Sequence, residues 1–237
     1  MIRSSLILFV LLVLNLAAAQ TTETVTVESD GQSYPALLAS PEAEGEYPGI
    51  VLLHSFRGFQ DGYKTFTEEF AAQGYVVLSV EWQTFEQQPE DATVVQLVRD
   101  AIEVLRPLDN VSGNFGLTGF CAGGRYTMLL LPQIKDFGAG FAWYGFPNNG
   151  EPAPIDLVAD LDAPLYIAHG SADEPSPIAG IYDYAQALDT AGKYYELKVY
   201  QGEPHGFMVN GAEVNRNEAA TDAFSEMLGF FDRQLKN

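Results

Sequence analysis

The sequence predicts an α/β protein with a mostly parallel central sheet, an antiparallel N-terminal hairpin and helices on both faces of the sheet. Two observations predict this class. Short, continuous apolar runs alternate with longer stretches of helical periodicity, and no repeat or low-complexity linker interrupts the series. We expect one domain over residues 20–237, because α/β domains commonly reach the length of this 237-residue chain.

The first predicted elements are two strands, 24–28 and 33–39. The dipeptide Asp30-Gly31 between them is typical of tight hairpin turns, so the two strands are expected to pair antiparallel. Residues 49–53 follow as a short, continuous apolar run. Such a run is typical of a parallel strand that is buried on both faces.

A helix is predicted over 63–73, where the apolar residues have helical spacing and Gly74 provides a stop. Residues 75–80 form the next buried strand. The stretch 92–107 carries its apolar side chains on one face of a helix. These side chains are Val94, Val95, Leu97, Val98, Ile102, Val104 and Leu105.

The same alternation continues to the C-terminus. We expect strands over 114–120, 139–144, 164–168 and 194–199, and helices over 122–131, 178–191 and 218–234. Active sites in sheets of this kind lie beyond the C-terminal ends of the strands. The loops that follow the strands are therefore the places to look for chemistry.

Composition excludes several classes of protein. With 47% hydrophobic and 12% aromatic residues, the chain can bury a full core, which excludes disordered, collagen-like and disulfide-stapled classes. The net charge of −20 disfavours nucleic acid and anionic lipid as partners. Cys121 is the only cysteine of the chain, so it forms no intramolecular disulfide and no cysteine-rich zinc site. We predict neither a metal nor a cofactor.

The N-terminus has the features of a signal peptide over residues 1–19. Arg3 provides a positive start, residues 4–16 are nearly all apolar, and Ala17-Ala18-Ala19 offers a small-residue cleavage site. We expect export to the periplasm or the exterior, and no membrane association after cleavage. An uncleaved N-terminal anchor stays open as the alternative.

The strongest chemical motif is Gly-x-Cys-x-Gly at residues 119–123, between a predicted strand and a predicted helix. It matches the nucleophile elbow, with Cys121 in the position that serine usually holds. The turn would point the sulfur out of the sheet at a helix N-terminus, where the helix dipole favours a thiolate. The alternative is that Cys121 is a small buried residue.

Two later loops supply a candidate acid and a candidate base. Asp173 lies a few residues beyond the predicted strand 164–168, where proteins with such an elbow carry an orienting carboxylate. Its neighbour Glu174 remains an alternative for that role. His205 follows the last predicted strand and completes the order nucleophile, acid, base.

The other two histidines are interpreted as structural. His169 closes a strand just before the acid loop, and we expect it to fix a turn. His54 precedes the loop after strand 49–53, and we expect it to support that loop by a hydrogen bond.

Three motifs together resemble the dienelactone hydrolase family. They are the elbow at 119–124, the loop Gly170-Ser171-Ala172-Asp173 and the run Pro204-His205-Gly206-Phe207. The resemblance extends from about Tyr34 to the final helix. It implies an α/β-hydrolase fold and an enzyme that cleaves a small-molecule carboxylic ester or lactone.

The resemblance also implies roles for individual residues. Cys121 is the nucleophile, Asp173 the orienting acid and His205 the base. In α/β-hydrolases the oxyanion hole is formed by the residue after the nucleophile and by the loop after the third strand. Here these donors are the N–H groups of Ala122 and Phe56.

The chain departs from the family in two ways. The family usually has a glutamate beside the elbow, and Ser55 occupies that position here. Activation of the thiol would then fall to His205 and the helix N-terminus, or to Ser55 acting as a relay. The family also holds the substrate carboxylate with arginines, and residues 206–210 contain none.

Several further residues are predicted to contact the substrate. Arg57 and Arg125 are the cations near the site, and each could instead form a surface salt bridge. An aromatic rim indicates an apolar acyl or alcohol group. Its members are Phe56, Trp143, Tyr144, Phe146 and Phe207.

Other functions remain open at this stage. A thioesterase or another acyl hydrolase would use the same site. A non-catalytic binding protein or a thiol redox protein on the same fold is the alternative from another class. The oligomeric state is expected to be a monomer or a homodimer.

Overall fold

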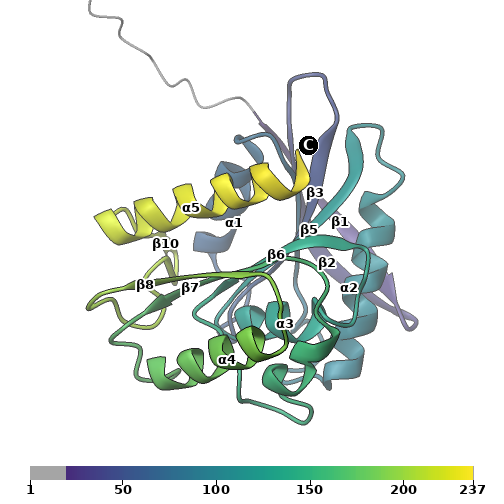
Figure 1. Ribbon diagram of the computed structural model, residues 1–237. Helices are drawn as coiled ribbons and strands as arrows, with labels where there is room; N and C mark the ends of the chain where they lie inside the picture. Colours follow the sequence, from purple (N-terminus) through teal and green to yellow (C-terminus); the bar gives the residue numbers. More distant parts are fainter. Residues whose placement is uncertain (1–19, 237) are drawn as a thin grey trace, which may run out of the picture.

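A computed structural model describes residues 20–236, so the predicted signal peptide over 1–19 lies outside the described residues. The core of the fold is an eight-stranded sheet in the order β1-β2-β4-β3-β5-β6-β7-β8 (Figure 1). β1 and β2 pair antiparallel, β2 pairs antiparallel with β4, and every other pair is parallel. The predicted α/β class with an antiparallel N-terminal hairpin is confirmed.

Each predicted strand forms, with its ends shifted by up to a few residues. The strands are β1 (Gln20–Ser29), β2 (Gln32–Pro41), β3 (Tyr47–Leu53), β4 (Val76–Val80), β5 (Val111–Phe120), β6 (Phe137–Trp143), β7 (Leu165–Gly170) and β8 (Tyr195–Tyr200). In the sheet register Leu53 pairs with Gly119, and Phe120 pairs with Trp143. The C-terminal ends of β3, β5 and β6 therefore meet at one edge, where the loops that follow them lie close together.

Helices cover both faces of the sheet (Figure 1). Those of one face are α2 (Asp91–Leu105), α3 (Ala122–Leu130) and α4 (Ile178–Thr190), and those of the other are α1 (Asp61–Ala71) and α5 (Glu218–Leu235). Each helix buries one apolar stripe against the sheet, as the sequence periodicity predicts. The result is two hydrophobic cores, one on each side of the sheet.

Three short elements have no counterpart in the sequence-based prediction. A 3₁₀ helix spans Pro154–Asp160, and a small hairpin consists of β9 (Val209–Asn210) and β10 (Glu213–Val214). The hairpin packs on the start of α1, where the Gly62 N–H donates to the Gly211 carbonyl at 3.2 Å. A side chain at Gly62 would collide with this carbonyl oxygen, so glycine permits the close approach.

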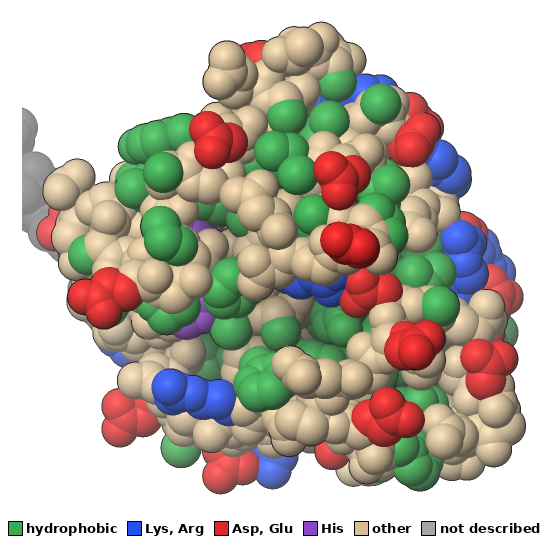
Figure 2. All heavy atoms as spheres, turned by 90° about the horizontal axis from the view of Figure 1, so that it is seen from below, with side chains coloured by type: hydrophobic (Ala, Val, Ile, Leu, Met, Phe, Trp, Pro, Cys, Tyr) green, Lys and Arg blue, Asp and Glu red, His purple; other side chains and the backbone are tan. Residues whose placement is uncertain are grey.

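The surface reflects the acidic composition. Acidic side chains are spread over the face shown in Figure 2, which is hollowed near its middle and has hydrophobic side chains around the hollow. Within residues 20–236, no helix combines the length and the apolar character needed to cross a membrane.

Candidate active site

Cys121 stands on a strained turn between β5 and α3. Its backbone has φ 58° and ψ −111°, a conformation that residues other than glycine rarely adopt. A Cβ atom at Gly119 would collide with the backbone of Gly123, and one at Gly123 would collide with the Leu53 carbonyl. The two glycines of the motif are therefore a steric requirement of this turn, which presents the half-buried sulfur at the N-terminus of α3.

His205 and Asp173 meet above this turn. His205 Nδ1 lies 2.8 Å from Asp173 Oδ2, although the two residues are 32 positions apart in the sequence. The carboxylate is fully buried, whereas the His205 side chain is 20% exposed. Since an ionised carboxylate can only accept, Nδ1 carries the hydrogen and Nε2 is left for the Cys121 sulfur. Glu174, the alternative acid, is exposed.

Asp173 accepts hydrogen bonds through both of its carboxylate oxygens. The Ser176 N–H donates to Oδ1 at 2.8 Å, and His169 Nε2 lies 3.5 Å from Oδ2. His169 also donates to the Ser176 carbonyl at 2.8 Å, so it closes this turn as the sequence predicts. The Ser176 hydroxyl donates to the Gly145 carbonyl at 2.7 Å and ties the acid loop to the segment after β6. These bonds compensate the buried charge and fix its position.

The surroundings of His205 favour its protonated form. Burial alone would lower the pKa of the imidazole, but the hydrogen bonds to Asp173 and to the Cys121 sulfur and the negative charges of both groups raise it to about 9. At neutral pH the histidine can therefore hold the proton that the thiol gives up.

The loop after β3 leaves one backbone donor free beside the sulfur. The Ser55 carbonyl accepts from His54 Nδ1 at 2.7 Å and from the Gly58 N–H at 3.1 Å. This carbonyl belongs to the same peptide unit as the Phe56 N–H, so fixing one end orients the other. Within the described chain, no protein group accepts from the N–H of Phe56 or of Ala122.

The outer part of this loop is also anchored. The Phe56 carbonyl accepts from Gln83 Nε2 at 3.1 Å and from Gln87 Nε2 at 2.8 Å. Burial lowers the pKa of His54 to about 4, so its imidazole is neutral and stacks on Trp82 with a centroid distance of 5.2 Å. His54 thus supports the loop by a hydrogen bond, as predicted.

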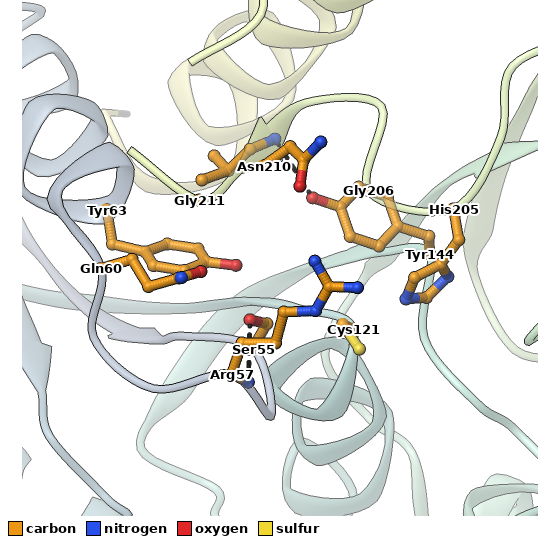
Figure 3. Close-up of a pocket in the computed structure, with 11 residues that line it drawn as sticks. Ser55, Arg57, Gln60, Tyr63, Cys121, Tyr144, His205, Gly206, Asn210 and Gly211 are labelled. Atoms are coloured by element: carbon orange, nitrogen blue, oxygen red, sulfur yellow. Dashed lines mark hydrogen bonds between the residues drawn. The ribbon is translucent and has the colours of Figure 1, made fainter. Parts of the chain in front are cut away.

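A polar cavity of about 210 Å³ lies on one side of Cys121 (Figure 3). Its lining includes Ser55, Arg57, Gln60, Tyr63, Tyr144 and Asn210, together with the sulfur and His205. In Figure 3 the hydroxyls of Tyr63 and Tyr144 and the guanidinium of Arg57 point into the same space. Burial raises the pKa of both tyrosines well above the ordinary value, so both are neutral phenols.

A second, wider cavity of about 540 Å³ lies on the other side of Cys121. Apolar side chains supply much of its wall, among them Phe56, Trp82, Pro89, Phe146 and Pro175. Phe56 is 39% exposed, and Phe146 lies 5.4 Å from the His205 ring, centroid to centroid. The sulfur and the histidine therefore stand between a polar cavity and a largely apolar one.

The two arginines near the site differ in their surroundings. Arg125 forms a bidentate pair with Asp91, at 2.6 and 2.7 Å, and its Nε donates to the Asn149 carbonyl at 2.7 Å. Arg57 forms no ion pair within residues 20–236, and no acidic residue lines the polar cavity that it faces. Arg125 is therefore held by Asp91 where it lines the wider cavity, whereas Arg57 borders both cavities without an ion pair among the described residues.

Two of the predicted substrate contacts are wrong. Trp143 is fully buried, donates to the Thr118 hydroxyl at 3.2 Å and stacks on Phe120, so it belongs to the core. Phe207 is 2% exposed and packs behind Tyr144 with a centroid distance of 5.5 Å. Neither side chain lines either cavity.

Several residues that line the polar cavity were not predicted from the sequence, among them three with polar side chains. Tyr63 lies within α1, Gln60 directly precedes that helix, and Asn210 belongs to the β9–β10 hairpin. None of them forms part of a motif. Tyr63 has the spacing of a core residue on an amphipathic helix, and only its hydroxyl reaches the cavity.

Comparison with known proteins decides the family. The model of the dienelactone hydrolase family matches residues 34–235, which is most of the chain. The chain belongs to the dienelactone hydrolase family. The predicted family and the predicted hydrolase activity on esters or lactones are confirmed at this level.

Individual relatives support this assignment. A Methylorubrum extorquens protein named "Putative carboxymethylenebutenolidase" is 30% identical over 83% of this chain and 76% of its own length. A Salmonella typhimurium protein of the same name is 29% identical over 87% of this chain and 85% of its own length. Among solved structures, a "Putative Dienelactone Hydrolase" from Klebsiella pneumoniae superposes with a TM-score of 0.82, at 24% identity over 91% of this chain and 99% of that one. The last likeness concerns the fold alone.

Proposed function

We propose that the protein hydrolyses carboxylic esters or lactones through a thioacyl-enzyme on Cys121. The observation that carries the proposal is the arrangement of three groups at one edge of the sheet. The sulfur sits on the elbow, and His205 lies between the sulfur and Asp173, with Nδ1 2.8 Å from the carboxylate. This is the arrangement that activates a weak nucleophile through an oriented base.

In the first half of the reaction, His205 takes the thiol proton and the sulfur attacks the carbonyl carbon. The Phe56 and Ala122 N–H groups hold the oxyanion, since both lack a protein acceptor in the described chain and both residues line the same cavity as Cys121. The bond to the alcohol oxygen then breaks, and His205 gives its proton to that oxygen. The alcohol departs, or stays attached if the substrate is a lactone, and a thioester remains on Cys121.

In the second half, water enters and His205 removes a proton from it. The resulting hydroxide attacks the thioester, the carbon–sulfur bond breaks, and the thiolate returns with imidazolium beside it. Asp173 keeps Nδ1 protonated throughout, so Nε2 always faces the reacting atoms.

Ser55 and Arg57 complete the proposal. The Ser55 hydroxyl faces the polar cavity and accepts from the Arg57 N–H at 3.3 Å, where family members usually have a glutamate. We assign activation of the thiol to His205 and to the N-terminus of α3. Arg57 would meet an anionic group on the substrate, whereas Arg125 is held by Asp91.

The test is Cys121→Ala, assayed with p-nitrophenyl esters, lactones and acyl thioesters. We expect turnover to fall by at least about 10³-fold, and Cys121→Ser to retain a small part of it. Full activity of Cys121→Ala would contradict the proposal. Preference for the acyl thioesters would favour the thioesterase alternative on the same site.

A thiol redox protein is the competing function from another class. It would give a disulfide-linked dimer on a non-reducing gel and no turnover that depends on Cys121. We further propose export with cleavage after Ala19. N-terminal sequencing of the protein secreted by its host, beginning at Gln20, would support this.

A further inference from the structure

The two cavities beside Cys121 differ in what they can bind. In the polar cavity, neutral hydrogen-bonding groups from Ser55, Gln60 and Tyr63 face a space of about 210 Å³. This is below the range of about 300–1,000 Å³ that is typical of whole small-molecule sites. The polar cavity therefore has room for a short group, and its walls favour one that carries oxygen.

Two tyrosines and the β9–β10 hairpin form much of the wall of the polar cavity. Tyr63 and Tyr144 form its inner wall and are almost fully buried. The β9–β10 hairpin closes another side by packing on the start of α1, through the Gly62 and Gly211 backbones.

The wider cavity has the opposite character. Its apolar wall includes the exposed Phe56, its members Asp91 and Arg125 pair with each other, and Arg57 borders both cavities. It borders His205, which must protonate the departing alcohol. An alcohol group in this cavity would lie beside the residue that gives it the proton.

The order of the reaction assigns the cavities to the two parts of the substrate. The alcohol leaves in the first half, while the acyl group stays bound to the sulfur until water arrives. We propose that the natural substrate has a short acyl group with a hydroxyl or oxo substituent that hydrogen-bonds to Tyr63, and an apolar alcohol group. This inference rests on the proposed function and names its substrate class.

Tyr63 is the specificity residue in this assignment. Its phenol lies close enough to the Ser55 side chain for a hydrogen bond, and it lines the same cavity as the Cys121 sulfur. An acyl group without oxygen would forfeit the hydrogen bond that a hydroxyl or oxo substituent makes to Tyr63. Such a loss is a strong basis for rejecting an analogue.

The experiment compares 2-naphthyl glycolate with 2-naphthyl propionate, which differ by a hydroxyl in place of a methyl group. We expect kcat/KM to favour glycolate by at least about 10-fold beyond the ratio of the two alkaline hydrolysis rates. Tyr63→Phe should reduce this excess to about two-fold or less, because it removes the hydroxyl that distinguishes the two acyl groups. Tyr184→Phe is the matched control, because it removes a buried hydroxyl that has no hydrogen-bond partner in the described chain and lines neither cavity, and the excess should persist.

The alcohol side is tested with phenyl and 2-naphthyl glycolate. We expect the naphthyl ester to be favoured about three- to ten-fold, from its larger apolar contact. Phe146→Ala should reduce that preference. An equal effect of Phe146→Ala on both esters would overturn the assignment of the apolar cavity to the alcohol.

The outcomes separate this inference from the proposed function. Turnover that depends on Cys121 but shows no glycolate excess, or that falls equally for both acyl groups in Tyr63→Phe, overturns the substrate assignment alone. Turnover of both esters that survives Cys121→Ala overturns the proposed function itself.

Discussion

Asp173→Asn is the substitution for which the structure makes the sharpest prediction. The parent carboxylate accepts from the Ser176 N–H through Oδ1 and from His205 Nδ1 through Oδ2. The Ser176 N–H can only donate, so the asparagine must turn its amide oxygen towards it. The amide NH₂ then faces His205 Nδ1, which must become an acceptor.

This reversal moves the histidine proton to the wrong nitrogen. With Nδ1 unprotonated, Nε2 carries the hydrogen and no longer accepts the thiol proton. The corresponding change in a serine protease lowers kcat by about 10⁴-fold. We expect kcat/KM of Asp173→Asn to fall by about 10²–10³-fold, which is a loss of about 3–4 kcal/mol of transition-state stabilisation. The loss is smaller than in the protease because a thiol depends less on its base than a hydroxyl does.

The assay is kcat/KM for an ester, with thermal unfolding to show that the variant is folded. Glu174→Gln is the matched control, since Glu174 is the adjacent acid and is exposed. Its activity should stay within about two-fold of the parent. Activity of Asp173→Asn within about three-fold of the parent, or an equal loss in Glu174→Gln, would refute the reasoning.

Three further predictions concern pH, packing and the elbow. The pKa of His205 is raised to about 9, so kcat/KM should fall as pH rises through that value. The imidazole then lacks the proton that it gives to the alcohol. A pH profile of kcat/KM that stays level at higher pH would contradict this. Arg125→Met should lower the free energy of unfolding by about 2 kcal/mol, because it strands the partly buried Asp91, and an unchanged denaturant midpoint would be evidence against this role. Gly123→Ala should lower the free energy of unfolding by about 4 kcal/mol or more, since its methyl group meets the Leu53 carbonyl. Gly229→Ala on α5 should leave the free energy of unfolding unchanged or raise it. Equal melting temperatures of the two variants would show the steric argument to be wrong.

Much of the architecture follows from local pattern. The apolar runs and helical stripes predict each long strand and helix, because each element must bury one face. The β9–β10 hairpin was missed because its strands have two residues each, too few for any periodicity. The elbow was predictable because its tight turn leaves no room for side chains at the two glycine positions. The positions of Asp173 and His205 follow from the order of the strands.

The walls of the cavities were harder to predict. Trp143 and Tyr144 are adjacent at the end of β6, yet Tyr144 faces the polar cavity and Trp143 the core. Which of the two faces the site depends on the turn that follows β6, where Tyr144 has φ 36°. Tyr63 has helical core spacing, and only the packing of α1 reveals that its hydroxyl reaches the site.

The central claim is that Cys121 carries the acyl group between the two halves of the reaction. Rapid acid quenching during turnover of 2-naphthyl glycolate, followed by peptide mass analysis, measures this directly. We predict a glycolyl adduct on the peptide that contains Cys121, removed by hydroxylamine and absent from Cys121→Ala. An adduct on another residue, or undiminished turnover by Cys121→Ala, would contradict the account.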